Sequence, residues 1–141
     1  MYSYKYPRPA LTADIVLLDK ERREVLLIKR GHEPFAGCWA FPGGFFDMDD
    51  ASIEATAERE LKEETGIEGV RLEELCTASK VGRDPRGRTV SVVFAGFTDS
   101  GKTAARGGDD AREARWFALD DLPQLAFDHA EILDKAIKRL L

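Results

Sequence analysis

The sequence predicts a mixed α/β fold, either an α+β arrangement or an α/β/α sandwich with a central mixed sheet. Apolar and β-branched runs separated by turns indicate several strands, and two periodic segments indicate helices. The strands do not alternate regularly with helices, which argues against a doubly wound parallel sheet. The length of 141 residues suits one hydrophobic core. We therefore expect a single domain over residues 1–141.

The first half of the chain predicts strands on either side of a long loop. Residues 1–10 are rich in tyrosine and proline and form a lead-in arm. The runs 12–18 and 24–29 are apolar, and the charged segment between them predicts an antiparallel hairpin. Glycines and prolines in residues 31–50 indicate a long loop, with a short extended piece at residues 39–41.

A helix follows this loop, and further strands follow the helix. Residues 50–65 lack proline and glycine and are rich in good helix formers, and Gly66 is placed to end the helix. Residues 70–77 predict a strand, and residues 83–88 a charged turn. The β-branched and aromatic run 89–97 predicts a strong strand.

The last third of the chain predicts a loop, a short strand and a closing helix. Residues 99–110 are polar and glycine-rich, and residues 113–117 read as a strand. Asp128 is placed to cap the last helix, with Glu131 completing a box-like cap. The apolar stripe of this helix consists of Leu133, Ala136, Ile137 and Leu140.

Composition narrows the class of protein. The net charge of −5 argues against a dedicated nucleic-acid-binding protein, which would carry a basic surface. Residues 47–64 alone carry a net charge of −6, so the acid excess is concentrated in one segment. No apolar run approaches a membrane span, and the first residues do not resemble a secretion leader. Cys38 and Cys76 form no disulfide framework. We expect a cytoplasmic protein that binds no membrane.

The predicted helix over residues 50–65 places carboxylates on its apolar face. At 100° per residue, Glu60 and Glu64 share the face of Ile53 and Ala57, and Glu63 borders it. Like charges four residues apart destabilise a helix, and burial adds to the cost. A divalent cation such as Mg²⁺, bound by oxygen ligands, would compensate this charge. The alternative interpretation is a solvated acidic face on a surface helix.

The same helix carries a family resemblance. Residues 59–67, RELKEETGI, match the pattern R-E-U-x-E-E-x-G-U, in which U is a bulky aliphatic residue. Together with residues 42–44, Pro-Gly-Gly, they resemble the Nudix box. The box has a glutamate six residues after the second glycine and eight before the arginine. Here the first count ends at Asp50 and the second at Ala51, so there is one extra residue, and Asp49 or Asp50 stands in.

The resemblance extends over nearly the whole chain. Further blocks are similar to Nudix hydrolases of the ADP-ribose pyrophosphatase type, and also to Nudix-related transcriptional regulators of NAD metabolism. These blocks are residues 6–10, 27–30, 39–45, 83–88, 113–117 and 126–129. The regulators carry a winged-helix domain after the Nudix domain, which we expect this chain to lack. The resemblance implies the Nudix α/β/α sandwich.

The resemblance implies a Mg²⁺-dependent pyrophosphohydrolase, with Mn²⁺ as an alternative metal, that cleaves a nucleoside diphosphate linked to another group. The favoured reaction is hydrolysis of ADP-ribose to AMP and ribose 5-phosphate. Glu60 and Glu64 are the expected metal ligands, assisted by Glu63 and by a backbone carbonyl of Gly44 or its neighbour Gly43.

The resemblance leaves two catalytic assignments with more than one candidate: the carboxylate that Arg59 orients, and the base. Arg59 is expected to orient Glu63 or a neighbouring carboxylate. The base that deprotonates water is either Glu64 or Glu113, and the alternative for Glu113 is an exposed strand residue.

Substrate contacts follow from side-chain chemistry. Arg30, Arg86 and Arg88 are candidates for phosphate binding, because guanidinium groups match phosphate oxygens; the alternative for the last two is a solvated turn. Phe41 is the candidate for stacking on adenine, and Trp39 and Phe127 are alternatives. For each of these rings, the alternative to stacking is packing in the hydrophobic core. His129 is expected to be structural, with hydrogen bonding to a ligand as the alternative.

The sequence also offers three rival functions. Residues 96–103, GFTDSGKT, satisfy the P-loop pattern, but Gly107-Gly108 leaves no room for the helix that a P-loop must open. A second rival is a Nudix-fold nucleotide sensor without catalysis, and a third is a pyrophosphohydrolase of oxidised nucleoside triphosphates. The N-terminal arm can pack on its own domain or on a second subunit, so a homodimer is also an option.

Overall fold

The computed structural model describes residues 2–105, 107 and 111–141. Its strands are β1 (Ala10–Asp19), β2 (Glu24–Arg30), β3 (Trp39–Ala40), β4 (Gly43–Phe45), β5 (Glu73–Ala78), β6 (Thr89–Phe97) and β7 (Ala111–Ala118). Its helices are α1 (Ile53–Thr65) and α2 (His129–Leu140). Neither helix is long and apolar enough to cross a membrane.

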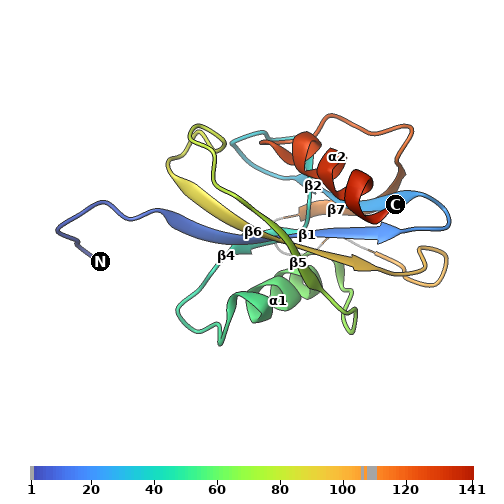
Figure 1. Cartoon of the computed structure of the whole chain (residues 1–141), viewed down its shortest axis with the longest axis horizontal. Helices are drawn as coiled ribbons and strands as arrows, with labels where there is room; N and C mark the ends of the chain where they lie inside the picture. Colours follow the sequence, from blue (N-terminus) through green and yellow to red (C-terminus); the bar gives the residue numbers. More distant parts are fainter. Residues whose placement is uncertain (1, 106, 108–110) are drawn as a thin grey trace.

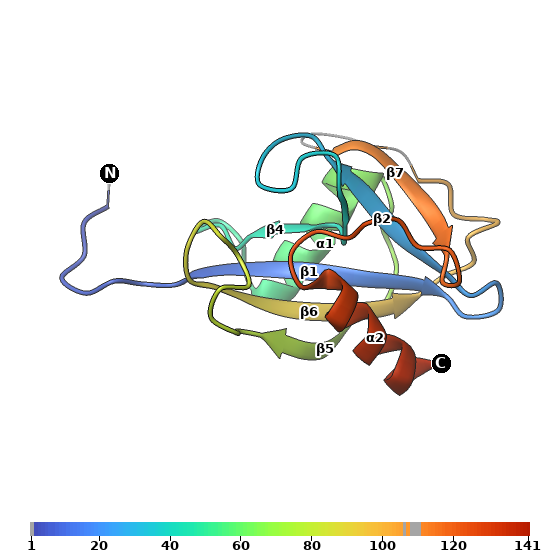
Figure 2. The same ribbon diagram turned by 90° about the horizontal axis from the view of Figure 1, so that it is seen from above.

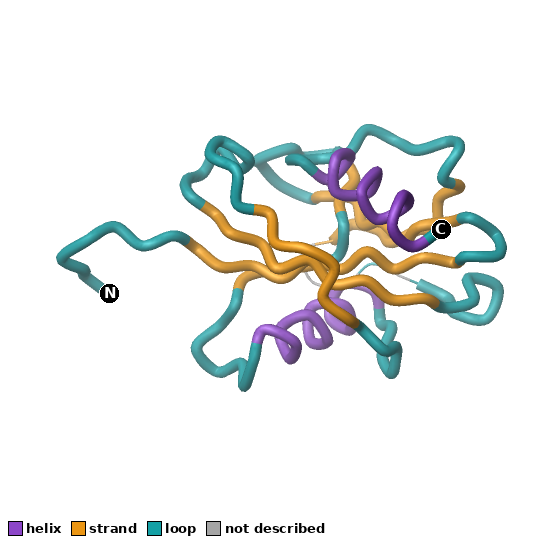
Figure 3. The backbone as a smooth tube through the Cα atoms, viewed as in Figure 1, coloured by secondary structure: helices purple, strands orange, loops and turns teal. Residues whose placement is uncertain are grey.

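The strands form one mixed sheet in the order β3-β2-β1-β6-β5, with β4 added to β1 and β7 added to β2. β1 runs parallel to β6, and all the other pairs are antiparallel. The two helices cover opposite faces of the sheet (Figure 1), which the tube drawing shows as strands between two helices (Figure 3). The predicted α/β/α sandwich with a central mixed sheet is therefore confirmed.

The central strand β1 is buried on both faces. Ile15 and Leu17 pack in the cluster that contains Ala57 of α1, while Val16 and Leu18 pack in the cluster that contains residues of α2. A strand buried on both faces needs a continuous apolar run instead of an alternating one. The run predicted over residues 12–18 has this character.

Helix α1 begins and ends close to the predicted bounds. The Ser52 side chain accepts a hydrogen bond from the Ala55 N–H and caps the first turn. Gly66 ends the helix in the left-handed conformation, with φ of 79°. On the inner face, Ala57 and Leu61 are almost fully buried. The helix therefore faces the sheet with the stripe that the sequence predicts.

The hairpin between β1 and β2 is confirmed, but its ladder is short. Only the pairs Leu18–Val25 and Asp19–Glu24 join the two strands. The amino-terminal half of β1 instead pairs with β4, a strand that the sequence pattern did not indicate. β2 diverges toward β3 and β7 (Figure 2). This divergence leaves space between β1 and β2 where the glycines of β4 enter.

The predicted cap of the last helix is wrong. Asp128 lies at the capping position of α2 but makes no capping hydrogen bond with its side chain. Its carboxylate instead accepts two hydrogen bonds of 2.9 Å from Nε and Nη2 of Arg83. The side chain of Arg83 is 5% exposed, so its charge needs this partner. An ion pair across 45 residues of sequence has displaced a local cap.

The P-loop rival is contradicted as well. Gly96 lies inside β6, and residues 98–105 form turns and irregular backbone, with no helix among them. The predicted loop 99–110 reaches into residues 106 and 108–110, which lie outside the described residues.

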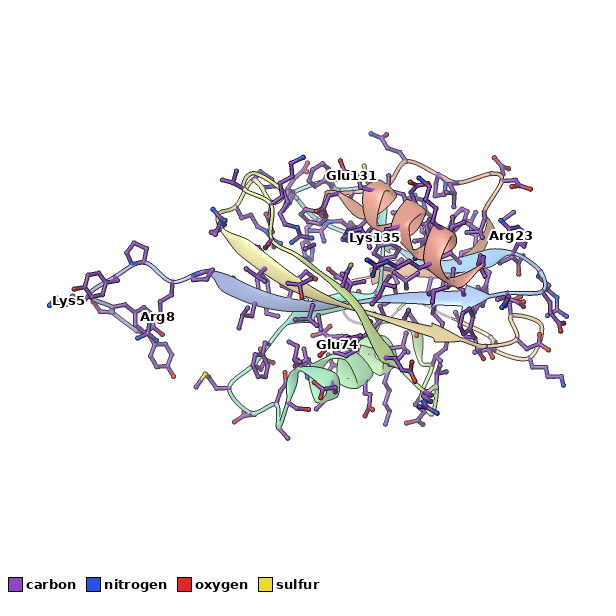
Figure 4. The ribbon with its side chains drawn as sticks, viewed as in Figure 1. Lys5, Arg8, Arg23, Glu74, Glu131 and Lys135 are labelled. Atoms are coloured by element: carbon purple, nitrogen blue, oxygen red, sulfur yellow. The ribbon has the colours of Figure 1, made fainter. Side chains whose placement is uncertain are left out.

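The N-terminal arm extends away from the sheet (Figure 2). Tyr2, Tyr4 and Tyr6 are each at least half exposed. Lys5 and Arg8 lie in the same projecting segment (Figure 4), and Arg8 packs over the ring of Tyr4. Among the described residues, the arm thus packs chiefly on itself.

Candidate active site

A cavity of about 270 Å³ opens beside α1, at the end of the sheet where β4 joins β1. Strands β1 and β4 and helix α1 supply one wall, and the end of β2 with the loops before β6 and before α2 supplies the other. The lining residues used below are Asp14, Arg30, Phe41, Gly43, Gly44, Phe45, Glu60, Glu63, Glu64, Arg83, Asp84, Arg86, Phe127 and His129. The two walls differ in charge, because the first carries carboxylates and the second carries guanidinium groups.

Glu60 and Glu64 form the acidic wall. Glu64 is 7% exposed and the side chain of Glu60 is 14% exposed, and the two carboxylates lie one turn apart on α1. Burial raises the pKa of Glu64 to about 9, with the nearby charge of Glu60 adding to the effect. Burial also raises the pKa of Glu60, although Arg59 opposes that rise. Two acids are thus held together where neither is well solvated.

The glycines of β4 let this acid pair approach the sheet. The Gly43 N–H donates a hydrogen bond of 3.1 Å to Oε1 of Glu64. A Cβ atom on Gly44 would lie 2.5 Å from Cδ and Oε1 of Glu60. A Cβ on Gly43 would collide with the backbone of Ala13 and with Asp14. A side chain at either glycine would therefore have to displace a neighbouring atom of β1 or α1.

Arg59 lies outside the cavity lining and ties the acids of the helix to the preceding loop. Its Nη1 donates to Glu60 at 2.7 Å and to Glu63 at 3.2 Å. Its Nε and Nη2 each donate to Asp50 at 2.9 Å, and Nη2 also reaches the Phe45 carbonyl. Asp50 therefore holds the arginine, and the arginine holds Glu60 and Glu63.

A second buried group lies on β1 behind the glycines. Asp14 accepts a hydrogen bond from Ser91, and its Oδ2 lies 3.8 Å from Nε2 of His129. Nδ1 of His129 accepts a hydrogen bond from the Phe41 N–H. Burial lowers the pKa of His129, so the ring is neutral at pH 7 and carries its proton on Nε2, facing Asp14. This contact ties α2 to the segment that precedes β4.

The opposite wall is cationic and aromatic. Burial lowers the pKa of Arg30, and the neighbouring charge of Arg86 lowers it further. Burial would raise the pKa of Asp84, but hydrogen bonds from the Arg86 side chain and backbone outweigh it and lower the pKa. Cζ of Arg30 lies 4.9 Å from the ring centre of Phe127. Two neighbouring guanidinium groups facing a cavity favour an anionic ligand.

The structure brings most of the predicted site residues together. The cavity is lined by Gly44, Glu60, Glu63, Glu64, Arg30, Phe41 and Arg86. Glu113 is not among the lining residues: it pairs with Lys29 across the ladder between β2 and β7, and it forms an ion pair with Arg115. Arg88 does not line the cavity either, and its Nη2 donates to the carbonyl of Ser79.

Phe41 and Trp39 are poorly placed for stacking. Phe41 is 2% exposed and stacks on His129, with ring centres 4.5 Å apart. Trp39 packs edge-on against Phe117 in the core. Phe127 is partly exposed and lines the cavity. Phe41 and Trp39 therefore pack in the core, as the alternative interpretation of these rings predicts.

Several lining residues were missed from the sequence. Asp14, Arg83 and Asp84 line the cavity, as does Phe45. Asp14 is the single acid in the apolar run 12–18, and this was an available signal, because a buried carboxylate needs a partner. Arg83 and Asp84 lie in the block 83–88 and Phe45 lies in the block 39–45, so the family resemblance of these blocks was the available signal for the other three.

The donor set at the acid pair suits a hard divalent cation. Carboxylate and carbonyl oxygens are the ligands that Mg²⁺ prefers, and it often takes only one or two carboxylates with waters and phosphates. In the described part of the chain, no three His, Cys, Asp or Glu side chains are grouped closely enough to hold a metal by themselves. A metal here would therefore take Glu60 and Glu64, completed by backbone, water or substrate oxygens.

A mixed-sheet α/β/α sandwich with an acid pair on the first helix, in contact with a Gly-Gly strand, fits a metal-dependent hydrolase that acts on phosphate anhydrides. The NUDIX domain model matches residues 8–140, and the chain belongs to the Nudix family.

Relatives extend this result. The ADP-ribose pyrophosphatase of Methanocaldococcus jannaschii is 42% identical over 128 residues, covering 91% of this chain and 73% of that protein. The ADPR responsive transcriptional repressor NtrR of Acinetobacter baylyi is 34% identical, covering 96% of this chain but only 56% of the repressor. The NUDIX domain of Shewanella oneidensis NrtR, solved with ADP ribose, matches at 34% identity with a TM-score of 0.90, covering 99% of this chain and 94% of that one.

Proposed function

We propose that this chain hydrolyses ADP-ribose to AMP and ribose 5-phosphate with bound Mg²⁺, and with Mn²⁺ as an alternative. The observation that carries the proposal is the buried pair Glu60–Glu64, which lines one cavity together with Arg30 and Arg86. A diphosphate with its metal matches this distribution of charge. The names of the archaeal pyrophosphatase and of the NUDIX domain solved with ADP ribose support the choice of substrate.

The acid pair is proposed as the metal site. Glu60 and Glu64 supply the main carboxylate ligands, the carbonyl of Gly44 is a further ligand, and Glu63 assists from the edge of the cavity. A bound divalent metal would neutralise phosphate charge and make water more acidic. The Gly43 N–H orients the Glu64 carboxylate, and Arg59 orients those of Glu60 and Glu63.

The proposed base is Glu64. Of the two candidates, it lines the cavity, whereas Glu113 lies on β7 in an ion pair with Arg115. A base must reach the water whose proton it takes, directly or through one further water. Glu113 does not meet this condition from outside the cavity.

The proposed phosphate contacts are Arg30 and Arg86. Both line the cavity that the acids also line. In the described residues, Arg30 donates through Nε to the Pro34 carbonyl, which leaves its two terminal nitrogens to reach a ligand. Arg88 is assigned no contact, because it lies outside the lining.

A panel assay tests the function. The chain would be incubated with ADP-ribose, other nucleotide sugars, dinucleotides and nucleoside triphosphates, including oxidised ones, with Mg²⁺ or Mn²⁺. We expect ADP-ribose to give the highest kcat/KM, with AMP and ribose 5-phosphate as products. Comparable or better turnover of triphosphates would overturn the substrate assignment.

A second candidate function is ADP-ribose sensing without turnover. The favouring observations are the 34% identity to an ADPR responsive repressor and the departure from the box at residues 49–51. A sensor would bind ADP-ribose by calorimetry yet release no AMP with either metal. Release of AMP at a rate of enzymatic magnitude would remove this candidate.

We further propose that residues 1–141 act as one domain, in the cytoplasm. The support is the continuous sheet with helices on both faces and the two free cysteines. Size-exclusion chromatography with light scattering would decide between a monomer and a homodimer, and deletion of the exposed arm would test its part in a dimer.

A further inference from the structure

Two polar side chains that line the cavity have no role in the proposed hydrolysis. His129 is the first residue of α2, and Asp14 lies on β1, the strand at the centre of the sheet that α2 covers (Figure 1). Side chains alternate across a strand, so Asp14 shares the face of Val16 and Leu18, which pack in the cluster that contains residues of α2. The side chains of His129 and Asp14 are 4% and 13% exposed. These two residues are called the floor pair below.

The ring of His129 is fixed with a donor toward Asp14. Nδ1 accepts a hydrogen bond of 3.1 Å from the Phe41 N–H, so the proton of the neutral ring is on Nε2. Stacking on Phe41, with ring centres 4.5 Å apart, holds the plane of the imidazole. Nε2 lies 3.8 Å from Oδ2 of Asp14, which is too far for a direct hydrogen bond. An oxygen atom beside this gap could lie about 2.9 Å from both atoms.

The floor pair keeps unused hydrogen-bonding capacity. Among the described residues, no hydrogen bond reaches Nε2 of His129 or Oδ1 of Asp14, whose Oδ2 accepts from Ser91. The same part of the chain holds no fully enclosed side-chain nitrogen or oxygen that lacks a partner. Nε2 and Oδ1 therefore reach the cavity, where a ligand or water completes them.

The floor pair lies close to the place proposed for the diphosphate. Burial raises the pKa of Glu64, and the charge of Asp14 adds to this rise. Burial lowers the pKa of Arg30, and the charge of Asp14 opposes this fall. A Cβ on Gly43, whose N–H binds Glu64, would lie 2.3 Å from Oδ1 of Asp14. A group bound by the floor pair would thus adjoin both the acid pair and the phosphate-binding arginine.

The chemistry of the floor pair selects an uncharged hydroxyl. A phosphate oxygen would accept from His129, but the carboxylate of Asp14 would repel it. A cation would be attracted by Asp14, but it would meet the N–H of the imidazole. A hydroxyl fits both residues, because its proton is donated to the carboxylate while its oxygen accepts from Nε2. In the proposed substrate, the hydroxyl groups belong to the two riboses.

We propose that Asp14 and His129 bind a ribose hydroxyl of the nucleotide substrate. The inference rests on the proposed function, because it assigns a place to a sugar of that substrate. A substrate without this hydroxyl leaves the donor of His129 and the acceptor of Asp14 unpaired, and a site built in this way discriminates against it. The floor pair is therefore a specificity determinant for ribose over deoxyribose.

The test removes one hydroxyl of the ligand at a time. The parent ligand is the analogue of ADP-ribose in which a methylene group replaces the oxygen between the phosphates, so it is not cleaved there. The deoxy forms lack the 2′- or 3′-hydroxyl of the adenosine ribose or of the terminal ribose. Calorimetry with Mg²⁺ gives the Kd of each. We expect at least one deoxy form to bind the wild type about 10- to 100-fold more weakly than the parent, and its identity shows which ribose the floor pair binds.

Two variants test the two halves of the floor pair. Asp14→Asn keeps the shape of the side chain and an oxygen for Ser91, but removes the charge. His129→Asn places an amide oxygen as far along the side chain as Nδ1, so the Phe41 N–H keeps an acceptor while the Nε2 donor is lost. In each variant we expect the penalty for the deoxy form to fall to within about threefold. Either variant suffices if the other folds poorly by circular dichroism.

Asp47→Asn is the matched control. Asp47 lines the same cavity and loses the same charge, but its side chain is 62% exposed and pairs with Arg59. An exposed ion pair contributes little, so we expect the ratio of the deoxy Kd to the parent Kd to stay within about twofold of the wild-type ratio. The control separates the loss of a hydrogen bond from the loss of one negative charge.

Each outcome decides the inference. Equal Kd values for all ligands in the wild type, absence of binding of the parent, a penalty that persists in a folded variant of the floor pair, or the same change in Asp47→Asn would overturn it. Cleavage of ADP-ribose itself by the wild type is scored separately. Discrimination against a deoxy form without cleavage would leave the floor pair standing and reject the proposed function. Cleavage without discrimination would do the reverse.

Discussion

Replacing Gly44 by alanine would separate the geometry of the acid pair from the stability of the fold. The new Cβ would lie 2.5 Å from Cδ and Oε1 of Glu60, whereas ordinary contact begins at 3.4 Å. The carboxyl group of Glu60 would therefore retreat by about 0.9 Å, and a misplacement of about 1 Å in a catalytic site can cost about 100-fold in rate. Because the obstacle is the end of a side chain, we expect the free energy of unfolding to change by less than about 1 kcal/mol.

The assay pairs kcat for ADP-ribose with urea unfolding. Gly69→Ala is the control, because Gly69 has a φ of 78° and no atom within 4 Å of an added Cβ. Alanine there should lower the free energy of unfolding by about 1–2 kcal/mol and leave kcat unchanged. If Gly44→Ala keeps its full kcat, the close approach of Gly44 to Glu60 has no catalytic role and the reasoning fails.

Three further predictions concern stability and the rejected motif. A hydrogen bond from the Arg22 backbone N–H, acting against burial, holds the pKa of Asp19 below its usual value. The ionised Asp19 therefore stabilises the folded state above about pH 4, and this contribution to the free energy of unfolding is lost as the pH falls. Asp19→Asn should therefore lower the free energy of unfolding by about 1–3 kcal/mol near neutral pH and flatten its decline in acid; urea titrations with the wild-type acid slope would contradict this. Asp128→Ala leaves the buried Arg83 unpaired and should cost about 3–5 kcal/mol in the same assay, and a loss under about 1 kcal/mol would contradict it. Lys102→Ala should keep the wild-type kcat, whereas complete loss would revive the P-loop hypothesis.

The parts of the fold that the sequence predicts best are those with a local signal. Helix α1 is bounded by Gly66 and carries a 3.6-residue period, and both are read from neighbouring positions. The strands β1 and β6 are long and apolar because they lie in the middle of the sheet. These two strands could therefore be predicted without knowing which strands they pair with.

The parts that the sequence misses depend on distant contacts. β4 is a three-residue strand, Gly-Gly-Phe, whose pairing with β1 no local pattern predicts. Asp128 has the residue type and place of a helix cap, but Arg83 competes for its carboxylate from the far loop. The strand β5 begins at Glu73, which pairs with Ala95 of β6, whereas the sequence predicts a start at Val70.

The candidate site divides in the same way. Glu60 and Glu64 lie one turn apart on a single helix, so the pattern alone places them together. The opposite wall joins side chains of β2, the loop before β6 and the loop before α2. Its members Arg30 and Arg86 were chosen for their chemistry, and the same criterion selected Arg88, which does not line the cavity. The place of Asp84 depends on the loop before β6, and that of Phe45 depends on the pairing of β4 with β1.

The most direct test of the account is the release of AMP from ADP-ribose by the wild type, by Glu64→Gln and by Glu58→Gln. Glu58 lies on the same helix and is exposed, so it controls for the loss of one negative charge. We predict Mg²⁺-dependent release of AMP by the wild type and by Glu58→Gln, and a fall of at least about 100-fold in Glu64→Gln. Full activity in Glu64→Gln would contradict the claim that the buried acid pair is the centre of the reaction.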